Sequence, residues 1–388
     1  MKSTKEWNEN KIKILFVIDK LTGGGAEKVL QNLVNHMDQD RFDITVLTFE
    51  DTDPEPYLNK EVHYRSLYRA RTKKGGILYH SLFRILAEAG IAHALFIRDS
   101  FDIEVAYLEY GPTKFVAQSQ NRNATKLAWV HFDLSLNNPD MNSIRRQKEA
   151  YRKFSRIACV SYAAKDGFMR LFGGNHHVEV IPNVIDEEEI LRKAAEQVPD
   201  DSTEAYADCG MKLIAVGRLA KSKGFDNLIR CCARLKAEGI FFKLEILGEG
   251  TERKALESQI RISGLKNTVF LRGFVTNPYP YLKRADVFVC SSHNEGSSTA
   301  IQEALILGKA VVTTDCPGMR EIIGDSHFGI LTKDNWESLY NGIRRIVTSK
   351  ELYSHYEKMA RECGSGMKKA IAVRKNEAFF IEAMQEKR

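Results

Sequence analysis

The sequence predicts an α/β protein with two doubly wound parallel sheets, one in each half of the chain. Short runs of β-branched and other apolar residues alternate with longer segments of helical periodicity, which is typical of parallel strands joined by crossover helices. This alternation occurs twice, with an acidic stretch of weak apolar periodicity at 186–206 between the two series. A chain of 388 residues is also long enough to form two domains, each with its own core.

The first series of elements lies before the acidic stretch. Strands are expected at the short apolar runs 12–18, 44–48, 103–107, 127–130 and 156–160. Helices are expected where apolar residues recur every three or four positions, at 26–37, 82–94 and 143–154. Strands that alternate with helices in this way predict the first parallel sheet.

The second series follows the acidic stretch, which itself contains a short predicted helix at 190–195. Strands are expected at 213–217, 243–247, 269–271, 287–289 and 311–314. Helices are expected at 297–307, 335–348 and 352–360, with a break at 364–366 before a last helix. The acidic stretch is therefore interpreted as a linker between two Rossmann-like domains.

Composition and charge describe an ordinary globular protein. Hydrophobic residues make up 43% of the chain and charged residues 28%, with a net charge of +6. The chain contains no run near the roughly 20 apolar residues that cross a bilayer. The first residues are polar and lack the apolar core of a signal peptide. We therefore expect a cytoplasmic location.

Two carboxylates with seven residues between them are the most informative feature of the sequence. Glu295 follows a predicted strand, and Glu303 lies two turns inside the helix predicted at 297–307. They bracket a helix N-terminus, whose free N–H groups and positive dipole end can hold a phosphate. A sugar nucleotide offers a diphosphate between two polyols and suits such a site. A solvated helix with incidental acids is the alternative.

Cations follow another predicted strand of the same half. Gly217 ends that strand, and Arg218 and Lys223 come directly after it. The carboxyl ends of strands are where open α/β sheets bind their ligands. An arginine can form two hydrogen bonds to phosphate oxygens, and a lysine adds a point charge. Either residue alone is more often an ordinary exposed cation, but the pair favours a phosphate site.

Glycine-rich loops in the sequence do not predict a dinucleotide or ATP site. The loop that includes Gly24 and Gly25 opens a predicted helix, but Lys28 stands where a dinucleotide fingerprint needs its third glycine. No P-loop sequence is present. Gly24 and Gly25 are instead expected to form a tight turn that brings the backbone close to a ligand. His131 ends a predicted strand, where a lone histidine is more often a structural hydrogen-bonding residue than a catalytic one.

The order of these motifs resembles the signature of retaining glycosyltransferases of glycosyltransferase family 4. The resemblance rests on 217–219 with 223–224 and on 295–304, and it covers most of residues 210–332. It is looser in the first half, where it rests on the segments 12–18, 23–27, 129–131, 160–161 and 181–186.

The resemblance implies a GT-B fold, in which two Rossmann-like domains face each other across a deep cleft. It implies an acceptor-binding domain at 1–190, a donor-binding domain at 191–366, and a final segment, 367–388, that packs back on the first. It also implies transfer of a sugar from a nucleotide-sugar, here a UDP-sugar, with retention of configuration and without a bound metal. Similar enzymes build surface polysaccharides, which suggests a glycan acceptor carried on a lipid.

The resemblance also assigns roles to residues of this chain. The expected catalytic residues are His131, Arg218, Lys223 and Glu295. The expected donor-binding residues are Gly24, Gly25, Gly217, Arg218, Lys223, Arg272, Gly273, Phe274, Glu295, Gly296, Ser297, Ser298, Thr299 and Glu303. Glu295 is expected to hold sugar hydroxyls, Glu303 the ribose, and 272–274 the base. The sequence departs from the family at Ser297, where an aromatic residue is usual, so the donor sugar stays open.

Two basic groups, 65–84 and 145–156, carry much of the positive charge. Apolar residues are interleaved with the first, so it is predicted either to contact an anionic membrane or to form a solvated loop. The enzyme would then be peripheral on the inner face of the plasma membrane. No nucleic-acid module accompanies the charge, so nucleic acid is not expected as a partner. A UDP-sugar epimerase of the same fold and a non-catalytic nucleotide-sugar-binding subunit remain alternative functions.

Overall fold

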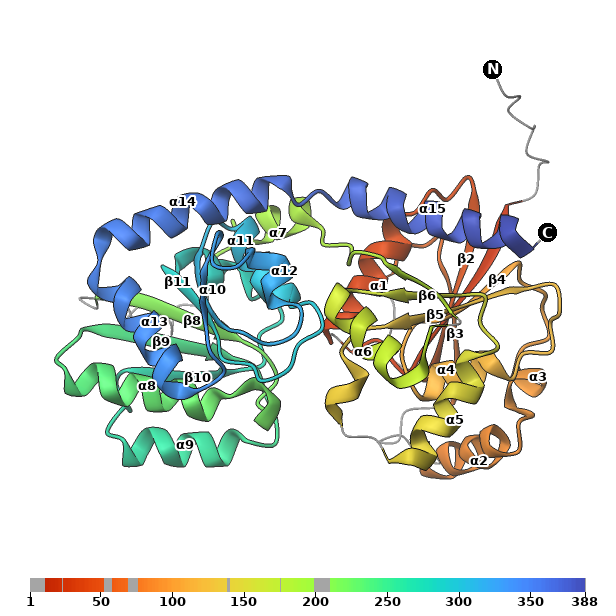
Figure 1. Cartoon of the computed structure of the whole chain (residues 1–388), viewed down its shortest axis with the longest axis horizontal. Helices are drawn as coiled ribbons and strands as arrows, with labels where there is room; N and C mark the ends of the chain where they lie inside the picture. The colour runs from red at the N-terminus through yellow and green to blue at the C-terminus, as the bar shows by residue number, and fades with distance from the viewer. Residues whose placement is uncertain are drawn as a thin grey trace, which may run out of the picture. The chain divides into compact units, whose positions relative to one another are not determined.

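The computed structural model describes residues 11–22, 24–51, 58–68, 76–137, 140–174, 176–198 and 210–387. The chain divides into two compact units. Unit 1 comprises Met1–Val184 and Ala370–Arg388, and unit 2 comprises Ile185–Lys369. Each unit is built around one parallel sheet with helices packed on it (Figure 1).

Unit 1 contains a seven-stranded parallel sheet in the order β3-β2-β1-β4-β5-β6-β7. Its strands are β1 (Ile12–Ile18), β2 (Phe42–Glu50), β3 (His63–Tyr68), β4 (Ile103–Ala106), β5 (Thr125–Val130), β6 (Arg156–Cys159) and β7 (His177–Val180). The order reverses between β1 and β4, since the chain moves outward in one direction from β1 and in the other from β4. The central strands are buried on both faces, as parallel sheets require.

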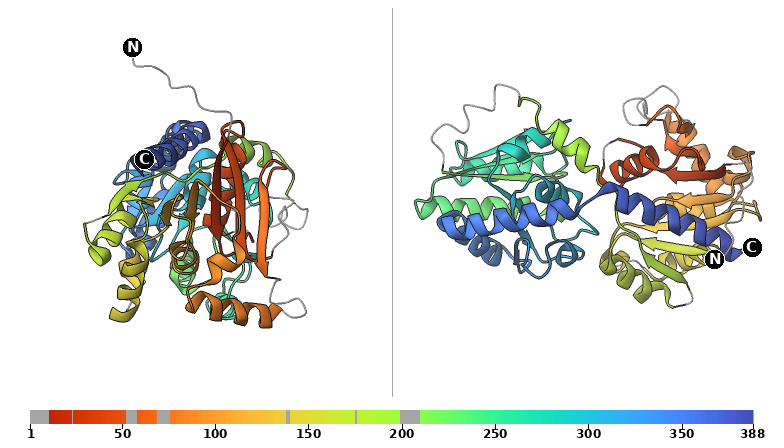
Figure 2. Two further views of the ribbon diagram at one scale, coloured as in Figure 1. Left: turned by 90° about the vertical axis from the view of Figure 1, so that its right-hand side faces the viewer. Right: turned by 90° about the horizontal axis from the view of Figure 1, so that it is seen from above.

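The helices of unit 1 cover both faces of this sheet (Figure 2). They are α1 (Gly25–His36), α2 (Gly76–Glu88), α3 (Ala92–Phe96), α4 (Gly111–Ala117), α5 (Met141–Tyr151), α6 (Tyr162–Phe172) and the C-terminal α15 (Lys369–Lys387). α15 supplies core side chains from the far end of the sequence. The ring of Phe380 packs edge-on against Phe16, with centroids 5.7 Å apart, and Phe379 packs against Trp129 at 5.4 Å.

Unit 2 contains a six-stranded parallel sheet in the order β10-β9-β8-β11-β12-β13. Its strands are β8 (Met211–Val216), β9 (Phe242–Leu247), β10 (Val269–Gly273), β11 (Val287–Cys290), β12 (Ala310–Thr314) and β13 (Ile330–Thr332). Its helices are α7 (Glu187–Lys193), α8 (Phe225–Ala237), α9 (Arg253–Ile262), α10 (Tyr279–Arg284), α11 (Thr299–Ile306), α12 (Met319–Ile323), α13 (Trp336–Thr348) and α14 (Lys350–Gly366). Here the order reverses between β8 and β11.

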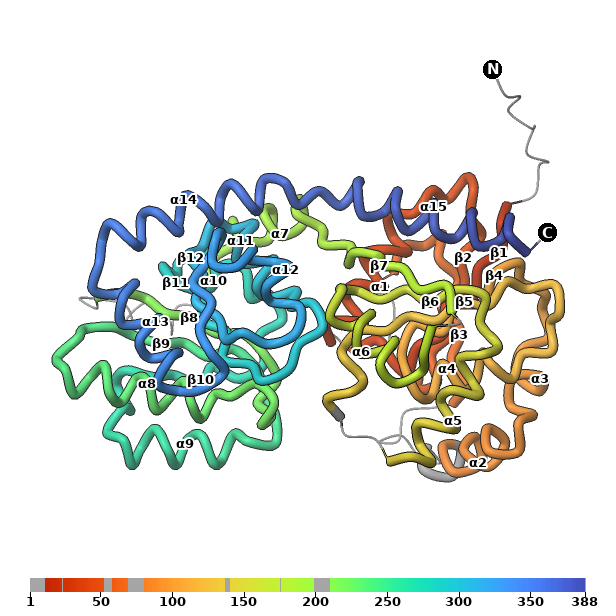
Figure 3. The backbone as a smooth tube through the Cα atoms, viewed as in Figure 1, coloured from red at the N-terminus to blue at the C-terminus, as the bar shows by residue number. Residues whose placement is uncertain are grey.

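The prediction of two doubly wound parallel sheets is confirmed, and so are all ten predicted strands. Two predicted helix boundaries are wrong. The helix expected at 82–94 is two helices, α2 and α3, because the chain turns at Gly90 with φ +77°. The break expected at 364–366 lies slightly later, because α14 ends at Gly366 and the last helix, α15, begins at Lys369 (Figure 3). A Cβ at Gly364 would lie under 3.0 Å from the backbone of Leu305, so this glycine allows α14 to pack closely against α11.

The helices of the described ranges include none that is long and apolar enough to span a bilayer.

Candidate functional site

Two loops of unit 2 are joined where the sheet order reverses. The loop after β8 contains a short 3₁₀ helix, Lys221–Lys223, and the loop after β11 runs beside it. The Ser291 hydroxyl donates to the carbonyl of Lys223 (2.8 Å), and the backbone N–H of His293 donates to the carbonyl of Ser222 (2.8 Å). In open α/β sheets, this reversal is where ligands bind, beyond the carboxyl ends of the strands.

Gly224 makes this close approach of the two loops possible. Its φ is +61°, a left-handed conformation that glycine adopts without a steric penalty. A Cβ built on it would lie under 3.0 Å from the carbonyl oxygen of Ser291. The backbone that carries Lys223 is therefore fixed against the loop that carries Glu295.

Lys223 and Glu295 form an ion pair at this place. The Lys223 ammonium donates to Glu295 Oε1, and the Ser292 hydroxyl donates to the same oxygen at 2.9 Å. Both charged side chains stay partly exposed, with 23% of Lys223 and 16% of Glu295 accessible. The structure thus brings together two predicted site residues that lie 72 positions apart.

Arg218 lies at the carboxyl end of β8, one residue after Gly217. The backbone N–H of Gly217 donates to the carbonyl of Leu247 (3.0 Å), and a Cβ at Gly248 would overlap the carbonyl of Gly217. This backbone packing orders the segment, while the Arg218 side chain is exposed. Within the described part of the chain, neither a hydrogen bond nor an ion pair engages its guanidinium group.

The N-terminus of α11 lies in the loop after β11. Ser298 is the N-cap, and its hydroxyl accepts a hydrogen bond from the N–H of Ile301 (3.4 Å). Gln302 donates to the hydroxyl of Ser297 at 3.2 Å. Gly318, with φ +84°, leaves room for the carbonyl of Gly296, which a Cβ would overlap. These contacts order the turn that leads from Glu295 to Thr299, the first residue of the helix.

Glu303 lies further along α11 in a different environment from Glu295. Its carboxylate is buried and accepts a hydrogen bond from the hydroxyl of Tyr279 on α10 (3.3 Å). The two predicted carboxylates are therefore distinct, since one pairs with a lysine and the other is held by a tyrosine.

The side chain of Arg272 is engaged in an ion cluster around a buried carboxylate. Arg272 lies near the end of β10, and its Nε donates to Oε1 of the fully buried Glu245 at 2.6 Å. Arg284 donates to both oxygens of the same carboxylate, at 2.8 and 2.7 Å. Of the predicted base-binding segment, the Gly273 carbonyl accepts a hydrogen bond from the N–H of Gly248 (2.7 Å), and the exposed ring of Phe274 remains available to a ligand.

In unit 1, His131 follows β5 and is held by backbone groups. Its Nε2 lies 2.8 Å from the carbonyl oxygen of Tyr107. A carbonyl only accepts, so Nε2 carries the proton and Nδ1 of the neutral ring keeps a free lone pair. Burial lowers the pKa of His131 to about 4, so the ring is neutral at pH 7.

Two acids of unit 1 that the sequence analysis missed lie at the reversal of its sheet. Asp19 directly follows β1, and Glu109 follows β4 and accepts a hydrogen bond from the N–H of His131. Burial raises the pKa of Glu109 to about 7. Burial, with the charge of Glu27 nearby, raises the pKa of Asp19 to about 6. Their positions just after strands were the signal that could have identified them.

The glycine loop of unit 1 holds a carboxylate of its own. Glu27 accepts hydrogen bonds from the N–H groups of Thr22 and Gly24, the latter at 3.1 Å. A Cβ at Gly24 would lie 3.2 Å from the Glu27 carboxylate, so the glycine gives that group room. Gly25 is the first residue of α1.

The predicted membrane surface at 65–84 is not supported by the described residues, which leave out 69–75. Arg65 pairs with Asp99, and Leu67 and Tyr68 pack against the core of unit 1. Phe83 belongs to that core, although Leu82 is exposed. No group of three or more His, Cys, Asp or Glu among the described residues is arranged to hold a metal ion.

Two family models match the chain, one in each half. The model "Glycosyltransferase Family 4" matches residues 23–189, and "Glycosyl transferases group 1" matches residues 207–363. HepE of Anabaena, solved in complex with UDP and glucose, superposes with a TM-score of 0.77 at 21% identity, covering 96% of this chain and 100% of that one. The chain has the GT-B fold. A second GT-B structure, sucrose-phosphate synthase of Thermosynechococcus elongatus, covers 95% of this chain and 98% of its own with a TM-score of 0.78 at 16% identity.

Curated relatives match different shares of this GT-B chain. An N-acetylgalactosamine-N,N'-diacetylbacillosaminyl-diphospho-undecaprenol 4-alpha-N-acetylgalactosaminyltransferase of Campylobacter jejuni is 37% identical over 185 residues, which is 47% of this chain and 48% of that protein. The chain thus matches about half the length of this relative. An uncharacterized glycosyltransferase of Haemophilus influenzae is 20% identical over 343 residues, 87% of this chain and 91% of its own.

Proposed function

We propose that this GT-B protein is a retaining glycosyltransferase that moves a sugar from a UDP-sugar to a lipid-linked glycan in surface polysaccharide biosynthesis. The observation that carries the proposal is the Lys223–Glu295 pair, which lies with Arg218 and the start of α11 beyond β8 and β11. Two cations and a helix N-terminus suit a diphosphate, and a carboxylate beside them suits sugar hydroxyls. The matches to two glycosyltransferase models support this interpretation.

In the proposed reaction, the bond between the sugar and the diphosphate breaks, and negative charge develops on the leaving UDP. Arg218, Lys223 and the backbone amides of Ser297–Thr299 stabilise that charge. Because the charge is larger in the transition state than in the bound substrate, these contacts lower the activation barrier. The acceptor hydroxyl attacks from the same face, and its proton passes to the leaving phosphate oxygen. No metal ion and no protein nucleophile take part.

Other residues orient the donor in this proposal. Glu295 binds sugar hydroxyls. Its contact with Lys223 weakens when these hydroxyls bind. Glu303 binds the ribose, and the exposed ring of Phe274, directly after Gly273, stacks on the base. In unit 1, the free Nδ1 of the neutral His131 accepts a hydrogen bond from a substrate hydroxyl.

The names of related proteins support the choice of donor and acceptor. The Campylobacter jejuni relative is named for a diphospho-undecaprenol acceptor, which supports a glycan carried on a lipid diphosphate. HepE was solved with UDP, which supports a uridine nucleotide as the leaving group.

The decisive experiment incubates the purified chain with a panel of UDP-sugars, with and without an undecaprenyl-diphosphate glycan, in the presence of EDTA. UDP release that requires the acceptor, with the same anomeric configuration in donor and product, supports the proposal. A converted sugar without release identifies an epimerase. Binding of UDP-sugar without either reaction identifies a non-catalytic subunit, and a requirement for added metal contradicts the metal-free mechanism.

A further inference from the structure

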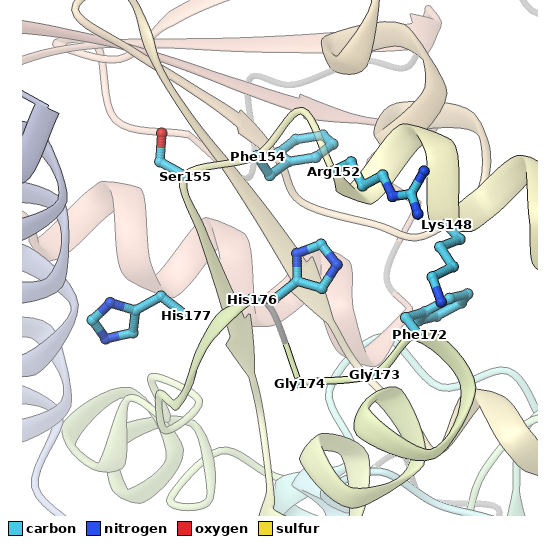
Figure 4. Close-up of a pocket in the computed structure, with 9 residues that line it drawn as sticks. All are labelled: Lys148, Arg152, Phe154, Ser155, Phe172, Gly173, Gly174, His176 and His177. Carbon is cyan, nitrogen blue, oxygen red and sulfur yellow. The ribbon is translucent and has the colours of Figure 1, made fainter.

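A cation-lined hollow of about 340 Å³ lies in unit 1 between the ends of α5 and α6 (Figure 4). Its walls come from the segments that precede β6 and β7, so it lies at the amino ends of these strands. His131 and Glu109 follow β5 and β4 at the opposite, carboxyl ends of the same parallel sheet. The hollow is therefore separate from the candidate site of unit 1.

Three basic side chains point into this hollow (Figure 4). Lys148 lies in the last turn of α5, Arg152 is the C-cap residue of that helix, and the His176 ring faces them from the segment before β7. Its neighbour His177 points away and contacts Glu179 and Glu386. Burial, together with the charges of Lys148 and Arg152, lowers the pKa of His176.

The charges of Lys148 and Arg152 are uncompensated within the described residues, where no carboxylate comes within ion-pair distance of either. Like charges four residues apart destabilise a helix. Elsewhere in this chain, exposed cations at that spacing face acids, as in the pairs Arg145–Glu149, Arg234–Glu238 and Arg253–Glu257. At the hollow, by contrast, Lys148 and the exposed Arg152 place two positive charges side by side without an acid facing them.

The favourable dipole of a helix C-terminus explains why cations occur in the last turn of α5. It does not explain why they converge on a hollow. The side chains of Phe154 and Phe172 at its wall are buried, and the His176 ring is held edge-on by Phe168 with centroids 5.6 Å apart. Cations that only face water need neither an apolar wall nor a positioned imidazole.

We propose that this hollow binds a phosphate group, as a phosphate monoester or diphosphate. The guanidinium of Arg152 forms two parallel hydrogen bonds to phosphate oxygens, Lys148 adds its charge, and a ring nitrogen of His176 donates a third contact. The ligand is the headgroup of an anionic lipid or a small soluble phosphate. The proposal stands independently of the glycosyltransferase reaction, since it uses no residue of that site.

The test follows histidine resonances of the ¹⁵N-histidine-labelled full chain during titration with sodium phosphate, with sodium chloride adjusted to hold ionic strength constant. We expect a saturable shift of the His176 signal, identified by its loss in His176→Gln, and no shift of His355 on α14 of unit 2. Lys148→Ala and Arg152→Ala should each weaken binding about tenfold, since each removes a charge-assisted hydrogen bond. Arg145→Ala, the same charge change on the same helix, should leave it unchanged.

The source of the phosphate is then found by flotation with vesicles of phosphatidic acid, which carries a phosphate monoester, or of phosphatidylcholine. A lipid headgroup is identified if the wild type floats with the anionic vesicles and the Lys148→Ala/Arg152→Ala protein does not. Phosphate binding without flotation identifies a soluble ligand. Absence of a saturable His176 shift, or an equal loss of affinity in Arg145→Ala, would overturn the proposal, provided the variants melt at the wild-type temperature.

Discussion

The position of Lys223 depends on the absence of a side chain at Gly224, and this makes Gly224→Ala a sharp test of the candidate site. Alanine in a left-handed conformation costs about 1 kcal/mol. The new Cβ would also overlap the carbonyl of Ser291, and forced overlap in a packed site costs a further 1–3 kcal/mol, roughly. We expect unit 2 to lose about 2–4 kcal/mol of stability.

Gly264→Ala is the matched control. Gly264 has φ +68°, close to that of Gly224, but no atom lies within 4 Å of its built Cβ. It should therefore lose only the conformational contribution of about 1 kcal/mol. Native-state hydrogen exchange of peptides from β11 measures the opening of unit 2 in both variants. We also expect weaker UDP binding in Gly224→Ala alone, because Lys223 is displaced. Equal losses of stability in the two variants would refute the reasoning.

Three further predictions concern charged groups. Lys223→Ala should weaken UDP binding at least about tenfold by calorimetry, whereas Lys221→Ala, an exposed neighbour, should not; equal affinities would place the nucleotide elsewhere. Glu245→Gln should cost about 3 kcal/mol in urea unfolding because two largely buried arginines lose their counter-charge, while the exposed Glu257→Gln should cost under about 0.5 kcal/mol. The pKa of His131 is about 4 in the folded chain and returns to its ordinary value of 6.5 on unfolding. Between pH 6.5 and 4, the His131 ring therefore takes up a proton only in the unfolded chain. Unfolding free energy should therefore fall as the pH drops from 6.5 to 4, and His131→Gln should flatten that part of the profile; an unchanged slope would show that the folded ring titrates normally.

The strands that the sequence analysis missed share one physical property. β3, β7 and β13 lie at edges of their sheets, so each has a neighbour on one side only. β3 is exposed or half-buried along its length, and β7 begins with an exposed histidine. Apolar runs arise where both faces of a strand are buried, and the central strands were predicted for that reason.

Position after a strand was enough to predict which residues lie close together, whereas the partner that each side chain selects was not predictable. Position after β8 and β11 was enough to place Lys223 and Glu295 in one region, and the structure joins them. The same rule applied to Asp19 and Glu109 would have identified them. The pairing of Arg272 with Glu245 could not be predicted, because it depends on which face of β9 and β10 each side chain occupies in three dimensions.

The packing of α15 on unit 1 has a consequence for synthesis of the chain. Phe379 and Phe380 cover Phe16 and Trp129, yet they leave the ribosome only after all of unit 2 has been made. The first sheet must therefore wait with an uncovered aromatic surface while the second domain folds. A nascent chain arrested before Lys369 should expose that surface to chaperones, although every one of its strands is already present.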